Sequence, residues 1–395
     1  MRITMKLSCS GFKLFLACSL LLLSNLAFAA DATVDCSGAT PGAFTSINAA
    51  LASLPAAGPN SIAVTGICTE SVVIVGRTDL AVFGNPSAVI QPPAPTNRAL
   101  VIFGSQRVGF SNNITFNGGR GIAVNDNSRA DFDSITVQNS GGLGISSTDS
   151  IVHISNSSVT NNARSGISVS GGSFYLDSGV NVSNNGRSGV SAITAHLVLN
   201  GGDGTPGTAN IISHNTGVGV ALFNSAEGDI NGDNQITFNG GPFGLEVVHT
   251  STVLMSDGII NSNTGIGVHC GETSHCEWSG ATQINSNTGG GIEITDHSDA
   301  YIDGGIIISG NTGVGVTIDL SSVLNSLGGN TITNNTGDAV VLNTLSVLKF
   351  ALPDTITPAV GNLALNCNNG SLVIGDITPY KPRKCGPAFQ AVPIH

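Results

Sequence analysis

The sequence predicts an all-β fold: a single-stranded right-handed parallel β-helix of about 12–13 coils with a short N-terminal capping helix. Two observations lead to this prediction. Short Val- and Ile-rich runs alternate with Asn, Ser, Thr and Gly, and the chain holds 52 Gly but only 10% charged and 5% aromatic residues. In addition, one short motif returns along most of the chain at nearly constant spacing. Both features are typical of many short strands joined by tight turns.

The motif is an Asn followed within a few residues by Gly and then by an apolar residue. The spacing is 22–24 residues, with one of 30, and the ten copies begin at Asn117, Asn139, Asn162, Asn185, Asn215, Asn239, Asn263, Asn287, Asn311 and Asn335. A helical segment and a strict six-residue rhythm are both missing from the copies, which argues against leucine-rich repeats and left-handed β-helices. We expect the Asn and Gly to serve the scaffold, through turns with positive φ and through amide hydrogen bonds between stacked copies.

These coils, of the form "NxTG(I/V)G(I/V)", resemble the right-handed β-helix repeats of the pectate lyase-like superfamily (the pectin lyase fold) over roughly residues 45–375. The segment "TSINAALASL" is similar to the helix that caps the first coil in such proteins, with Thr45 or Ser46 as its N-cap. The resemblance implies a fold rather than an activity, because this fold carries lyases, hydrolases, esterases, epimerases and adhesins. The signatures of its polygalacturonases, pectate lyases and pectinesterases are missing, so no catalytic residue is transferred.

The chain divides into four expected segments. Residues 1–30 have a basic start, an apolar run and a small-residue end, which predicts a secretory signal peptide. Residues 31–60 are expected to form the N-terminal cap with its helix, 61–345 the right-handed β-helix, and 346–395 the last coils and a disulfide-stapled C-terminal cap. We therefore expect a secreted, periplasmic or cell-surface monomer that does not insert into the membrane after signal removal.

The net charge and the cysteines restrict the possible binding partners and metal ligands. Without residues 1–30, the chain keeps 11 basic and 25 acidic residues, a net charge of about −14, which argues against nucleic acid as a partner. Six cysteines remain, and their positions predict the disulfides Cys36–Cys68, Cys270–Cys276 and Cys367–Cys385. Zinc is the alternative for "HCGETSHC", but an even cysteine count in an exported protein favours the disulfide.

Because equivalent positions of successive coils stack in space, they can be compared as columns. One outward position is Ala, Ser, Thr or Val in most copies but Glu246, His269 and Glu293 in three consecutive ones. The next corner of the same three copies gives His249, Glu272 and Asp296. We predict a catalytic site in which Glu246 and Glu293, about 10 Å apart at Cα, act as acid and base with His269 between them. The alternative is a solvated column of charges.

Other residues predict contacts with a ligand. Trp278 could stack on a sugar ring, and Arg164 and Arg187, at equal offsets in adjacent copies, could hold a uronate carboxylate. Solvated turn arginines paired with nearby acids are the alternative. Asp229, Asp233 and Asp257 would suit calcium, and no other cofactor is expected.

Two hypotheses of function remain open at this level. The first is a polysaccharide lyase or glycoside hydrolase, supported by the column of Glu and His residues. The second is a non-catalytic surface, adhesive or structural β-helix that binds glycans, supported by the low aromatic content and the small outward residues elsewhere.

Overall fold

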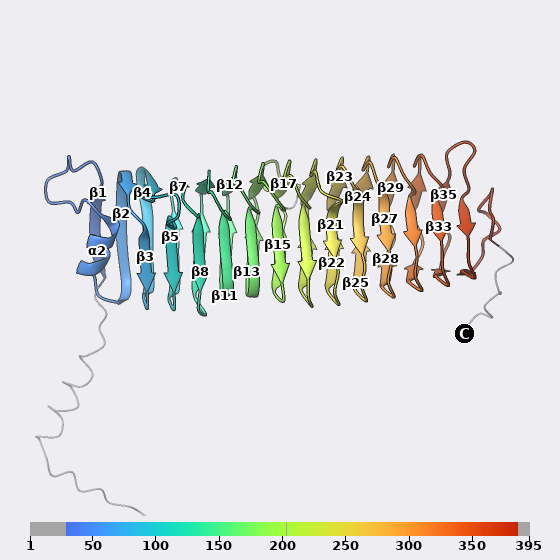
Figure 1. The fold of residues 1–395 in the computed structure, drawn as a ribbon, viewed down its shortest axis with the longest axis horizontal. Coiled ribbons are helices and arrows are strands. Elements are labelled where there is room, and N and C mark those ends of the chain that lie inside the picture. Colours follow the sequence, from blue (N-terminus) through green and yellow to red (C-terminus); the bar gives the residue numbers. More distant parts are fainter. Residues whose placement is uncertain (1–28, 203, 386–395) are drawn as a thin grey trace, which may run out of the picture.

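The structure is a computed structural model that describes residues 29–202 and 204–385. The chain winds into an all-β parallel solenoid of about 13 turns with one short helix. Figure 1 shows a rod in which the coils follow one another in sequence order from the N-terminal to the C-terminal end. Within the described residues, no helix is long and apolar enough to cross a membrane. The predicted signal peptide lies almost entirely outside the described residues.

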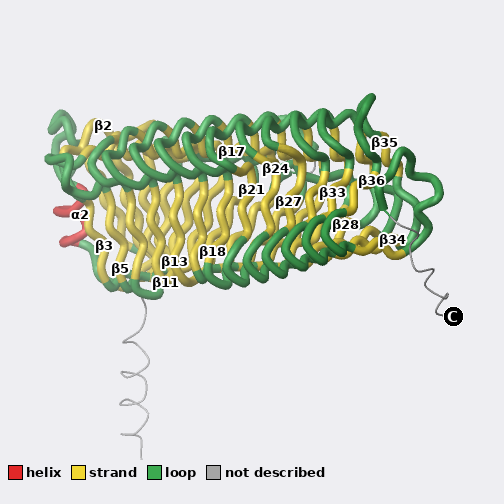
Figure 2. The backbone as a smooth tube through the Cα atoms, turned by 45° about the vertical axis from the view of Figure 1, so that its right-hand side comes forward, coloured by secondary structure: helices red, strands yellow, loops and turns green. Residues whose placement is uncertain are grey.

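Each central coil contributes strands to three parallel sheets, which run along the rod (Figure 2). The first sheet contains β8 (Ile122–Asn125), the beginnings of β11 (Ile145–Ser155) and β13 (Ile167–Asp177), β15 (Val190–Ile193), β18 (Val220–Phe223), β21 (Phe243–Val247), β24 (Ile266–Cys270), β27 (Gly290–Ile294), β30 (Val316–Ile318) and β33 (Val340–Leu342). The second contains β9 (Arg129–Asp133), the ends of β11 and β13, β16 (His196–Asn200), β19 (Glu227–Asn231), β22 (Thr252–Ser256), β25 (His275–Ser279), β28 (Asp299–Ile302), β31 (Val323–Ser326) and β34 (Val347–Phe350).

The third sheet contains β7 (Ile114–Asn117), β10 (Ile135–Gln138), β12 (Ser158–Thr160), β14 (Asn181–Ser183), β17 (Ile211–Ser213), β20 (Gln235–Thr237), β23 (Ile259–Asn261), β26 (Gln283–Asn285), β29 (Ile307–Ser309) and β32 (Thr331–Thr333). Successive strands of each sheet are parallel and in register. The inward apolar column predicted from the repeat is confirmed as buried core: Ile122, Ile145, Ile167, Val190, Val220, Leu245, Val268, Ile292, Val316 and Val340.

The repeated Asn residues form a buried ladder, as the sequence predicts, from Asn162 to Asn335. The Asn263 amide donates to the Ile236 carbonyl and to Asn287 Oδ1, while its own Oδ1 accepts from Asn239. Such a ladder satisfies backbone groups that would otherwise be orphaned inside the rod.

The prediction that the motif Asn adopts a positive φ is wrong for the ladder residues. In these coils the residue with positive φ is the one before the ladder Asn, for example Ser262 (φ 57°), rather than the Asn itself. The second Gly is required by close packing: a Cβ on Gly267 would lie 2.7 Å from Asn287 Nδ2. Two copies of the motif do not align with the ladder. Ser140, not Asn139, donates its backbone N–H to Asn162 Oδ1, and Asn117 is the register partner of Gln138, two residues before Ser140.

The N-terminal end is closed by α2 (Ile47–Ser53), which confirms the predicted capping helix. Ser46 is its N-cap and accepts from the Ala49 N–H, while Glu70 accepts from the N–H groups of Ile47 and Asn48. A carboxylate at this end also complements the helix dipole. The buried face of the helix covers the apolar end of the first coils, where β1 (Ala30–Asp35) pairs with β2 (Ala57–Thr69).

All three predicted disulfides are formed. Cys36–Cys68 lies beside the N-terminal cap and Cys367–Cys385 fastens the C-terminal segment to β36 (Leu365–Cys367). Cys270–Cys276 is fully buried and joins β24 to β25 across a corner, which excludes the zinc alternative for these thiols. This third disulfide holds the first and second sheets together on the coil that carries Glu272 at its corner.

Candidate functional site

The structure places Glu246, His269 and Glu293 at one register position of the first sheet. They lie on β21, β24 and β27, and each is the direct partner of the next. His269 Nδ1 lies 2.9 Å from Glu293 Oε2, and the His269 side chain is only 13% exposed. On the preceding coil, the register partner of Glu246 is Ala221, whose side chain is fully buried. The column of polar side chains therefore begins at Glu246.

The His269 ring is held in place on its other side by Phe243. The two rings stack with centroids 4.3 Å apart and an interplanar angle of 11°. Phe243 lies three residues before Glu246 on β21, so the same strand supplies both the aromatic support and the first carboxyl group. An imidazole with one nitrogen on a carboxylate and one face on a ring has little freedom to turn.

The Glu246 carboxyl group has an altered acidity. Burial raises its pKa above the ordinary value of 4.5, and this effect outweighs the opposing effect of His269. Glu272 raises the pKa further, while His249 lowers it. Glu246 therefore keeps its proton to a higher pH than an exposed glutamate, which is the property of a general acid.

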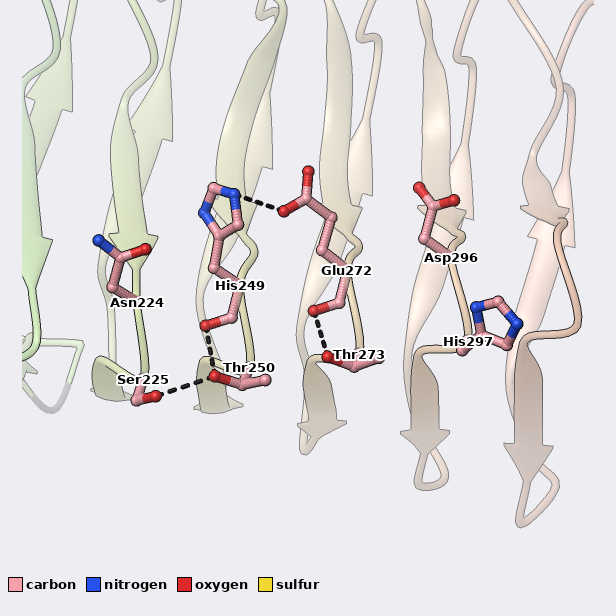
Figure 3. Close-up of a pocket in the computed structure, with 8 residues that line it drawn as sticks. All are labelled: Asn224, Ser225, His249, Thr250, Glu272, Thr273, Asp296 and His297. Atoms are coloured by element: carbon pink, nitrogen blue, oxygen red, sulfur yellow. Dashed lines mark hydrogen bonds and ion pairs between the residues drawn. The ribbon is translucent and has the colours of Figure 1, made fainter.

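The corner between the first and second sheets forms an open groove on the same coils. Its volume is about 800 Å³ and it is lined by Asn224, Ser225, His249, Thr250, Glu272, Thr273, Asp296 and His297. Figure 3 shows these side chains on successive corners, with His249 Nε2 and Glu272 Oε2 2.5 Å apart. Each corner is made of two consecutive residues with positive φ, such as Glu272 and Thr273. His249, Glu272 and Asp296 therefore lie on successive corners, as the sequence predicts. The charges of His249 and Glu272 also influence the pKa of Glu246.

Trp278 does not belong to this surface, and its predicted role as a sugar platform is wrong. Its side chain is 0% exposed and points into the core from β25, beside the inward Cys276. Side chains on a strand alternate between its faces, so Trp278 shares the inward face of Cys276, two residues earlier. If Cys276 faces inward, the sequence "HCEWS" predicts that Trp278 faces inward too.

Of the two arginines predicted to bind a ligand, only Arg164 lines a pocket with other arginines. Arg164 lines a pocket of about 240 Å³ together with Arg98, Arg120 and the Gly141–Leu143 turn, whereas Arg187 does not line it. Burial, and then the charge of Arg120, lowers the pKa of Arg98. Within the described part of the chain, none of these arginines forms an ion pair with a carboxylate. The pocket therefore gathers unpaired positive charge on an acidic protein.

The predicted calcium ligands do not converge. Among the described residues, Asp229, Asp233 and Asp257 do not come together as a group of metal ligands. Asp257 Oδ1 instead accepts the backbone N–H of Ala281 and fixes a turn. Asp229 lies against His196, with Oδ2 2.9 Å from Nε2. The geometry thus gives no support to calcium at these three residues.

The second sheet carries polar residues that the sequence analysis missed. His153 Nδ1 lies 2.9 Å from Asp177 Oδ2, and the His153 ring stacks on Tyr175 with centroids 4.2 Å apart. His275 similarly meets Asp299. These residues alternate with core positions on the strand that follows the corner, so an alignment of the copies on that strand predicts them.

Comparison with known proteins agrees with this architecture. Residues 98–257 match the family model described as "Right handed beta helix region". No curated protein matches the sequence at a significant level. The described chain is thus a parallel β-solenoid in which residues 98–257 match right-handed β-helix repeats.

Solved structures provide three points of comparison. The periplasmic alginate epimerase AlgG, as a double mutant, has 13% identity and a TM-score of 0.51 and covers 76% of this chain and 78% of its own. The A-module of a mannuronan C-5 epimerase, AlgE4 of Azotobacter vinelandii, has 12% identity, covers 87% and 94%, and has a TM-score of 0.46. Tailspike protein 3 of bacteriophage CBA120 has 11% identity, covers 84% and 57%, and has a TM-score of 0.42. At such identities the likeness concerns the fold alone.

Proposed function

We propose that this protein is an exported β-helix protein that binds an acidic polysaccharide and cleaves it at the column of Glu246, His269 and Glu293. The observation that carries the proposal is the half-buried Glu246 carboxyl group with its raised pKa, set two coils from a second carboxylate that contacts His269. Three disulfides support an extracytoplasmic location, since such bonds persist in oxidising compartments.

The two carboxyl groups would have different roles. Glu246, protonated to a higher pH, would donate its proton to the leaving oxygen of a glycosidic bond. Glu293 would accept a proton from water on the other side of the sugar, with His269 fixing its orientation. Two coils separate the residues by about 10 Å at Cα, which is on the order of the separation of about 6.5–9.5 Å between the carboxyl groups of inverting hydrolases.

The choice of an acidic polymer rests on the pocket of Arg98, Arg120 and Arg164. Guanidinium groups bind carboxylates through paired hydrogen bonds, and these three lack a protein carboxylate within the described residues. A neighbour in fold, with a TM-score of 0.51, is an alginate epimerase, so alginate is the first polymer to test.

The decisive experiment is an activity screen against alginate, pectate and neutral glucans. New reducing ends report hydrolysis, ultraviolet absorbance reports unsaturated uronides from a lyase, and NMR reports a change in uronate configuration. Glu246→Gln and Glu293→Gln should each lower kcat about 10²-fold or more. Glu277→Gln, on the outward face of the second sheet, is the matched control. Full activity in both site variants would refute the assigned residues.

A non-catalytic glycan-binding protein is the second candidate. The groove beside Glu246 is open and shallow, and the first-sheet positions in register with Glu246 on the preceding coils are Ala and Ser. Polysaccharide binding without product from any polymer in the screen would favour this function over cleavage.

A further inference from the structure

The second sheet holds a group of three metal-binding side chains, which we call the His196 cluster: His196, Glu227 and Asp229. Their ligand atoms all lie within 4.8 Å of one another. His196 on β16 and Glu227 on β19 are direct register partners on adjacent coils. Asp229 is two residues beyond Glu227 on the same strand, so both carboxylates project from the same face.

The spacing inside the His196 cluster is close to the distance between two ligands of one metal ion. His196 Nε2 and Asp229 Oδ2 lie 2.9 Å apart. Two ligands placed about 2.1 Å from one zinc ion lie about 3.0–3.4 Å from each other. Small rotations would therefore bring nitrogen and carboxylate oxygen to one cation without any movement of the strands.

The surroundings limit the cluster to one cation and keep it accessible. The partners of Glu227 and Asp229 on the next coil are Thr252 and Leu254, which add no charge. The Tyr175 ring lies edge-on to His196 with centroids 6.2 Å apart on the other side. Neither carboxylate pairs with a Lys or Arg anywhere in the described chain. His196 is about one-third exposed, so an ion could enter from solvent.

A histidine–aspartate hydrogen bond is the competing explanation, and the same sheet supplies its controls. His153–Asp177 and His275–Asp299 are comparable pairs, but neither belongs to a group of three ligands among the described residues. The third ligand, Glu227, is what distinguishes the His196 cluster from them. Asp229 already pairs with His196, so this hydrogen bond does not require Glu227. Glu227 nevertheless lies within 4.8 Å of both ligand atoms.

The geometry points to a divalent transition-metal site of the zinc class at His196, Glu227 and Asp229. One imidazole nitrogen with two carboxylates favours zinc over calcium or magnesium, which prefer all-oxygen shells. Three protein ligands leave coordination positions open to water or to a ligand's oxygen atoms, as in zinc sites that bind or activate a ligand. The site lies on a different sheet from Glu246 and does not depend on the proposed polysaccharide activity.

The test uses the untagged, disulfide-intact protein, stripped with EDTA and titrated calorimetrically with zinc and, separately, with calcium. We expect one zinc per chain, bound at least tenfold more tightly than calcium. Cobalt in place of zinc should give a visible spectrum that shows a bound imidazole and carboxylates.

The variants locate the site. His196→Ala and Glu227→Gln should each weaken zinc binding at least tenfold, while His153→Ala and His275→Ala should leave it unchanged. Circular dichroism would establish that all four variants are folded. Absence of stoichiometric zinc binding, equal affinity for calcium, or an equal loss in the His153 and His275 variants would each overturn the assignment.

Discussion

His269 and Glu293 occupy the same register position on adjacent coils, and Nδ1 of the histidine lies 2.9 Å from Oε2 of the glutamate. A carboxylate only accepts hydrogen bonds, so a hydrogen bond between these two atoms requires the hydrogen to be on Nδ1. Stacking on Phe243 then fixes the ring plane. The pair is thus a rigid link between two coils of the proposed site.

The first prediction follows from this link. Replacing His269 with Ala removes the group that orients Glu293, so kcat should fall about 10- to 100-fold with a smaller change in KM. Steady-state kinetics on the polymer identified in the screen would measure both constants. His275→Ala, which breaks a similar pair with Asp299 on the second sheet, should have little effect. An equal loss in that variant would contradict a local role for His269.

The second prediction concerns stability and pH. Burial raises the pKa of Glu246 in the folded protein, so its protonated form is favoured by folding. That contribution is fully present below the unfolded-state pKa, near pH 4, and is lost as the pH rises through the folded-state value. Glu246→Gln keeps a neutral side chain at every pH. The Tm of the variant minus the Tm of the wild type should therefore increase between about pH 4 and pH 7. Scanning calorimetry would measure this difference at each pH, and a decrease with rising pH would contradict the prediction.

The third prediction concerns the arginine pocket. Arg120→Ala and Arg164→Ala should each weaken binding of an acidic polysaccharide roughly tenfold and reduce the dependence of affinity on salt. Binding of a neutral glucan should not change. Arg129→Ala removes a similar charge from an exposed position on β9 and provides the control. Calorimetry at two salt concentrations distinguishes the variants, and an equal loss on the neutral polymer would count against the pocket.

The fourth prediction uses Trp278, the single tryptophan of the chain. Because its side chain is 0% exposed, its emission should be blue-shifted, resistant to iodide, and unchanged when oligosaccharide is added. Trp278→Ala should lower the free energy of unfolding by about 3–5 kcal/mol through the cavity it leaves. Fluorescence quenching by sugar or iodide would instead restore the surface role that the structure excludes.

The fifth prediction concerns the asparagine ladder. Asn263→Ala removes hydrogen bonds to buried groups on both neighbouring coils, so it should destabilise the protein by about 2–4 kcal/mol. The outward Asn261, on the preceding strand, should tolerate Ala within about 0.5 kcal/mol. Urea unfolding monitored by circular dichroism would measure both. Similar losses in the two variants would show that the ladder adds nothing specific.

The sequence predicts far more of the fold than of the site. Periodic Asn and Gly residues, alternating apolar positions and paired cysteines are local signals, and a solenoid turns them into stacked columns by repetition alone. For the same reason, the sequence alone predicts the order Glu246, His269, Glu293 along the first sheet. Where a copy departs from the pattern, as at Asn139 and Ser140, the Asn motif of that copy is placed one residue away from the ladder position.

Local sequence by itself therefore determined the coil, its core, its capping helix and which residues follow one another in the first-sheet column. Only the tertiary structure decided which side chains meet on neighbouring coils outside the first sheet: Arg98 with Arg120 and Arg164, and His196 with Glu227 and Asp229. The physical reason is that corner lengths and corner angles, not strand periodicity, set how one sheet faces the next. Those angles arise from residues with positive φ and from packing between coils, which no single repeat encodes.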